Sequence, residues 1–72
     1  MPKANQAIRK YAKENGVFLY EIATKFNISE SQFLRWIRTE FSPENKERTL
    51  KYIDEIAYEK REEEFYIEQE YE

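Results

Sequence analysis

Residues 19–38, LYEIATKFNISESQFLRWIR, carry the strongest structural signal in this chain of 72 residues. Apolar residues recur there at helical spacing on both sides of Asn27, and a small residue, Ala23, follows the first of them. Asn is the residue other than glycine that best tolerates a positive φ, which suits it to a tight turn. We therefore expect two short helices, over about 20–26 and 29–40, that cross at a sharp angle. The apolar positions that would join them are Ile22, Phe26, Ile28, Phe33 and Ile37.

A helix is expected before this pair, over residues 4–15. Ile8, Tyr11 and Ala12 fall on one face of it at helical spacing, and basic residues occupy the other faces. Gly16 follows as the residue that accepts the left-handed conformation in which helices commonly end.

A further helix is expected to begin at Ser42-Pro43-Glu44, because a cap, a proline at the first helical position and an acid at the positive end of the dipole follow in order. Its inward stripe would consist of Leu50, Ile53, Ile56 and Ala57. Beyond Tyr58 the apolar stripe fails, and the tail would either continue as helix or fray.

These elements predict an all-α fold, a small bundle of about four helices that contains a helix-turn-helix. The domain would span residues 1–58, followed by an acidic C-terminal extension or tail over 59–72. A chain of this length has room for one small core and for no buried cavity of enzyme size.

Composition argues against an enzyme. The chain has no cysteine and no histidine, which removes thiolate metal sites, the usual general base and the commonest metal ligand. We therefore expect no catalytic residue, no metal site, no cofactor and no small-molecule ligand. The N-terminus lacks the apolar region of a signal peptide and no segment approaches membrane-spanning length, so the expected location is cytoplasmic, without a membrane partner.

Charge is distributed unevenly along the chain. The formal net charge is −3, but residues 1–39 hold seven basic against three acidic residues, a balance of +4. Residues 59–72 hold seven glutamates against two basic residues, a balance of −5. A basic head can bind phosphate even on an acidic chain, because the local field matters more than the total.

The helix over 29–40 would present a polar face away from the core. With 100° per residue, Ser31, Arg35 and Arg38 fall opposite Phe33. The fork of an arginine side chain matches guanine in the major groove, and the amide of a glutamine such as Gln32 matches adenine. This face is typical of a helix that contacts DNA.

At this point the chain resembles the small phage-repressor-like helix-turn-helix proteins (Cro/lambda-repressor-type, XRE) of Gram-positive mobile elements. The resemblance covers residues 5–57 and rests on IRKYAKENGV at 8–17, EIATKFNIS at 21–29 and the run 33–40. It implies a lambda-repressor-like fold in which the residues after the turn enter the major groove. Leu19 stands where many members carry a glutamine that contacts phosphate, and Asn27 replaces the usual glycine.

By matched position, the resemblance implies that Glu30, Ser31 and Arg35 contact bases. Ser29, Gln32 and Arg38 match places that contact bases or backbone. The weaker candidates for phosphate contacts are Lys25, Arg9, Lys10 and Lys13.

The leading hypothesis is a sequence-specific DNA-binding protein and transcriptional regulator with double-stranded DNA as its partner. A homodimer on paired half-sites would use the last helix and Phe65, Tyr66 and Ile67. The alternative is a protein–protein interaction module that keeps the fold and binds another regulator through Leu34, Trp36 and the same tail residues.

Overall fold

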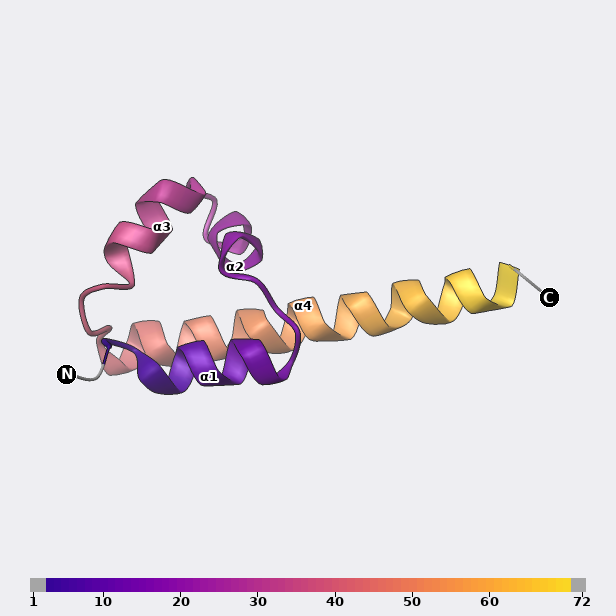
Figure 1. The fold of residues 1–72 in the computed structure, drawn as a ribbon, viewed down its shortest axis with the longest axis horizontal. Coiled ribbons are helices and arrows are strands. Elements are labelled where there is room, and N and C mark those ends of the chain that lie inside the picture. The colour runs from indigo at the N-terminus through magenta and orange to yellow at the C-terminus, as the bar shows by residue number, and fades with distance from the viewer. Residues whose placement is uncertain (1–2, 71–72) are drawn as a thin grey trace.

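In the computed structural model, the structure describes the backbone of residues 3–70 and the side chains of residues 3–62. It contains four helices in this part of the chain and no strand, which confirms the all-α class. The helices are α1 (Gln6–Glu14), α2 (Leu19–Lys25), α3 (Glu30–Trp36) and α4 (Pro43–Glu70). α1 and α2 pack on the first half of α4, whereas α3 packs mainly on α2 and lies at the outer side of the bundle (Figure 1).

α1 and α2 end in the same way. Gly16 has a φ of 67° and Asn27 a φ of 61°, so each provides the left-handed residue expected at the end of a helix. The next amide then closes the turn: Val17 N–H donates to the carbonyl of Ala12 at 2.8 Å, and Ile28 N–H donates to that of Ala23 at 3.1 Å. These two closures direct the chain back across the core.

α3 and α4 begin at the expected caps. The Ser29 hydroxyl accepts from Gln32 N–H at 3.2 Å, and the Ser42 hydroxyl accepts from Asn45 N–H at 3.3 Å. Each cap satisfies one of the amides that the first turn of a helix leaves without a partner.

The core is built from buried residues of all four helices. Ile22, Phe33 and Ile53 are fully buried there. Phe26 and Trp36 are half-buried, with ring centroids 5.1 Å apart in an edge-to-face arrangement, and Trp36 also lies 4.5 Å from Phe41. Because buried aromatic pairs add specific contacts to area burial, this cluster fixes the angle between the two helices of the motif.

Two helix boundaries differ by more than one residue from the sequence-based prediction. α3 ends at Trp36 rather than at residue 40, because the next carbonyls bind outside the helix: Asn5 Nδ2 donates to those of Ile37 and Thr39. α1 begins at Gln6 rather than at residue 4, because Asn5 has a φ of 57° and cannot be part of a right-handed helix.

The inward stripe of α4 also differs at one position. Leu50 was expected in the core but is 36 % exposed, and Thr49 is fully buried in its place. The Thr49 hydroxyl donates to the carbonyl of Asn45 at 2.7 Å, which satisfies the buried hydroxyl within the helix. The remaining members of the predicted stripe, Ile53, Ile56 and Ala57, are buried.

α4 continues as helix across the predicted domain boundary at residue 58 and through Glu70, and its second half extends beyond the other three helices (Figure 1). The described part of the chain measures 49 × 21 × 21 Å, so this helix sets the long axis. Within that part, no helix combines the length and the apolar character needed to cross a membrane.

Candidate nucleic-acid interface

The outer face of α3 is almost entirely exposed. Its exposed residues are Glu30, Ser31, Gln32, Leu34 and Arg35. Phe33 holds the helix on the bundle with no exposed surface, and the half-buried Trp36 seals its end. Ser31 and Arg35 are therefore accessible on the face opposite Phe33, as the periodicity predicted, and Glu30 and Gln32 are exposed beside them.

The start of α3 has a structural role beside any contact with a ligand. The hydroxyl of Ser29 is engaged in capping Gln32, so its position is fixed by the helix. Glu30 occupies the first turn, where a carboxylate is favoured by the positive end of the helix dipole. Ser31, Gln32 and Arg35 are thus the polar side chains of this face that the helix start does not use.

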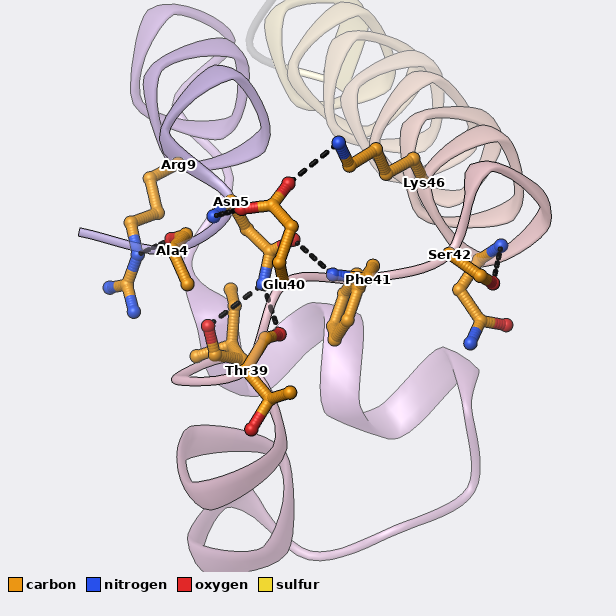
Figure 2. A network of polar contacts seen from close by, with 10 residues as sticks. Ala4, Asn5, Arg9, Thr39, Glu40, Phe41, Ser42 and Lys46 are labelled. Atoms are coloured by element: carbon orange, nitrogen blue, oxygen red, sulfur yellow. Dashed lines mark hydrogen bonds and ion pairs between the residues drawn. The ribbon is translucent and has the colours of Figure 1, made fainter. Parts of the chain in front are cut away.

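Asn5 holds the other end of α3, and its role was not predicted. It is 2 % exposed and joins the N-terminal segment to the loop after α3 (Figure 2). Its Nδ2 donates to the carbonyls of Ile37 at 2.8 Å and Thr39 at 2.9 Å, and its Oδ1 accepts from Phe41 N–H at 2.8 Å. One buried amide therefore fixes where α3 stops and how the chain enters α4.

Glu40 extends this network to α4. Its carboxylate accepts from Asn5 N–H at 2.9 Å and pairs with Lys46 at 2.6 Å (Figure 2). The hydrogen bond from the Asn5 backbone, together with the one from Lys46, lowers the pKa of Glu40 below its ordinary value. Glu40 thus joins the loop between α3 and α4 to Asn5 on one side and to Lys46 of α4 on the other.

The four phosphate-contact candidates differ in their surroundings. Lys10 and Lys13 are exposed on α1, and Arg9 is half-buried on the same helix. Lys25 instead pairs with two carboxylates of α4, Glu59 at 2.9 Å and Glu55 at 3.5 Å. The hydrogen bond to Glu59 is the main cause of a raised Lys25 pKa.

The remaining residues singled out in the sequence are Arg38, Leu34 and Leu19. Arg38 is exposed in the turn after α3 rather than on the helix itself. Leu34 is 38 % exposed on the outer face. Leu19 is half-buried and packs against the core.

Trp36 packs inward against Phe26, Phe33 and Phe41. Its surroundings are those of a partly buried aromatic residue of the bundle, as distinct from an exposed contact residue. The side chains of Phe65, Tyr66 and Ile67, expected in a dimer contact, lie outside the described residues.

Two features of the candidate site had weak or no sequence signals. Asn5 precedes a helix, where Asn is common, but nothing local indicates that its partners lie more than 30 residues away. The partners of Lys25 come from α4 and depend on how that helix crosses α2. Both contacts are tertiary, so helical periodicity could not reveal them.

A comparison of the chain with protein-family models, with curated proteins and with solved structures gave no match. The residues and their geometry therefore carry the functional argument.

Proposed function

We propose that this protein is a sequence-specific DNA-binding protein, a transcriptional regulator that inserts α3 into the major groove. The observation that carries the proposal is the outer face of α3, where Ser31, Gln32 and Arg35 are exposed together on a helix fixed at both ends. A rigid helix with an accessible arginine and glutamine can form paired hydrogen bonds with base edges. Such a regulator would act in the cytoplasm.

Two groups of residues would contribute differently to DNA binding, one to base recognition and the other to affinity. Arg35 and Gln32, with Ser31 and Glu30 beside them, would discriminate between base pairs. Lys10 and Lys13 of α1 would supply affinity through phosphate contacts that release counterions. The local positive charge of residues 1–39 supports this division despite the net charge of −3.

A dimer on two half-sites about one helical turn apart would increase both affinity and specificity. The backbone of the second half of α4 extends beyond the other three helices (Figure 1). We therefore propose that a homodimer forms through α4, with residues 65–67 in the contact. Sedimentation equilibrium would measure a mass near twice the 8.9 kDa of the chain for a dimer, and 8.9 kDa would exclude it at that concentration.

The discriminating experiment compares Arg35→Ala with Lys25→Ala in binding to a preferred duplex and to single-base variants of it. Loss of Arg35 should cost about 1–3 kcal/mol at one base pair and relax the preference there. Loss of Lys25 should weaken binding to all sequences alike, since it removes a cation and leaves Glu55 and Glu59 without their partner. Equal losses from both variants with an unchanged preference would exclude Arg35 from base recognition.

A protein-interaction module is the second candidate, and one observation favours it. Phe18 and Tyr20 are 60 % and 52 % exposed, and their rings stack with centroids 5.7 Å apart. Exposed aromatic residues are typical of surfaces that bind proteins. Salt separates the candidates: DNA binding should fall steeply as salt is added, whereas binding through an apolar protein surface should not.

A further inference from the structure

A cleft of about 510 Å³ lies between the N-terminal segment and the C-terminal end of α3. We name it the basic cleft. Its lining residues are Lys3, Ala4, Arg9, Leu34, Ile37 and Arg38. Three of the six are basic and none is acidic, and they come from three places in the chain.

The basic residues of this cleft form no ion pair with a described side chain, unlike several lysines elsewhere in the fold. The ion pairs among the described side chains use Lys25, Lys46 and Lys60, and none involves a cleft residue. Glu40, two residues after Arg38, is held by Asn5 N–H and Lys46 instead. The positive charge of the cleft is therefore not neutralised within the described part of the protein, which favours an anion there.

Arg9 is oriented before any ligand binds. Its Nε donates to the carbonyl of Ala4 at 3.0 Å, which turns the side chain back over the N-terminal segment (Figure 2). The two terminal NH₂ groups, with four N–H donors, remain for another acceptor. Because a guanidinium fork matches two oxygens of a phosphate, and Arg9 is half-buried, its ordering costs little additional entropy on binding.

The cleft lies at the C-terminal end of α3, the helix that we propose inserts into the major groove. Leu34 is on the outer face of α3, and Arg38 lies in the turn that follows the helix. We propose that the basic cleft binds one backbone phosphodiester of the duplex, next to the base pairs that α3 contacts. The proposal rests on the proposed function, and it adds Lys3 as a binding residue and gives Arg9 and Arg38 one shared ligand.

The first arm of the test uses inorganic phosphate, which has the same chemistry as the proposed ligand. Amide NMR shifts of the ¹⁵N-labelled protein should saturate at residues 3–9 and 37–38 as phosphate is added, but not with chloride at equal ionic strength. Shifts that rise without saturation, and equally across α4, would overturn the anion site.

The second arm uses duplex DNA. The double variant K3Q/R38Q should bind every duplex more weakly, keep the base preference, and reduce the slope of log K against log salt by about 0.9, the value for one lost phosphate contact. Lys51→Gln on the exposed side of α4 is the matched control, and its slope should stay unchanged. Thermal unfolding of each variant verifies the fold.

The outcomes separate this proposal from the proposed function. Duplex binding in which K3Q/R38Q matches Lys51→Gln would overturn the cleft and leave α3 as the reader. Saturable phosphate shifts without any duplex binding would overturn the backbone contact and the proposed function together, leaving a site for free phosphate.

Discussion

Asn5 and Asn27 adopt nearly the same left-handed conformation, with φ values of 57° and 61°, yet their surroundings are opposite. Asn27 is exposed at the turn of the motif. Asn5 is buried, and its side chain forms hydrogen bonds with three backbone groups of residues 37–41, at the end of α3 and in the loop that follows. The same residue type thus makes a turn at one site and holds the C-terminal end of α3 at the other.

This contrast gives a matched pair of variants. Asn27→Ala should lower the free energy of unfolding by about 1 kcal/mol, the cost of a left-handed alanine. Asn5→Ala should lower it by that amount and by about 2–4 kcal/mol more, because it leaves two carbonyls and one amide without partners. Urea denaturation measures both, and equal losses would show that the Asn5 hydrogen bonds contribute nothing net.

Sequence reasoning succeeded at this scale where the cause is local. The conformations of Gly16 and Asn27 and the caps Ser29 and Ser42 follow from neighbouring residues, and the structure confirms them. It missed Asn5 because its four hydrogen-bond partners in residues 37–41 all lie more than 30 residues away along the chain, and local sequence does not indicate such contacts.

At the scale of elements, α3 is a short helix with fixed ends. Ser29 sets its first turn, and the Asn5 network sets its last. Periodicity predicted which face of α3 is exposed, but it extended the helix to residue 40, because no local signal marks the end at Trp36. The choice of Thr49 over Leu50 in α4 has a similar origin, since neighbouring helices select the buried stripe.

The loop between α3 and α4 should make stability depend on pH. Hydrogen bonds from Asn5 N–H and Lys46 lower the pKa of Glu40 in the folded protein. A lowered folded-state pKa contributes stability that is complete above the unfolded-state value of about 4.3 and is lost as pH falls through the folded-state value. The Tm of Glu40→Gln should therefore fall less than the Tm of the parent protein when the pH is lowered from about 6 to about 3.

Glu47→Gln, on the exposed side of α4, is the control for the general effect of removing a carboxylate. Thermal unfolding followed by circular dichroism gives the comparison. An acid-induced loss in Tm that is the same for Glu40→Gln and the parent would contradict a role for this carboxylate in fastening α3 to α4.

At the scale of the whole molecule, the charges separate along the long axis. The seven basic residues of positions 1–39 belong to the part of the chain that forms α1, α2 and α3, and the backbone of the second half of α4 extends away from those helices (Figure 1). Among the described side chains, Ala57 is the last core residue, and Lys60 still anchors α4 by binding Glu21 and the carbonyl of Gly16, both at 2.7 Å. α4 is therefore fastened to the bundle up to residue 60.

A chain that ends at Glu62 tests the role of the acidic extension. It keeps every described core contact, so its Tm should stay close to that of the full chain. Because the deletion removes residues 65–67 from the proposed dimer contact, DNA affinity at low salt should fall. The backbone of α4 runs away from α3 rather than back over it, so removal of the acidic charge should not offset this loss. A tenfold tighter complex would show that the glutamates compete with DNA phosphate.

The central claim is that α3 recognises a DNA sequence, and selection from a random pool of duplexes tests it most directly. The full chain is mixed with the pool at low salt, and the retained duplexes are sequenced, with Arg35→Ala carried through in parallel. We expect an enriched motif for the parent that loses its preference at one base pair in the variant. Retention without enrichment, or no retention, would contradict sequence-specific recognition by α3.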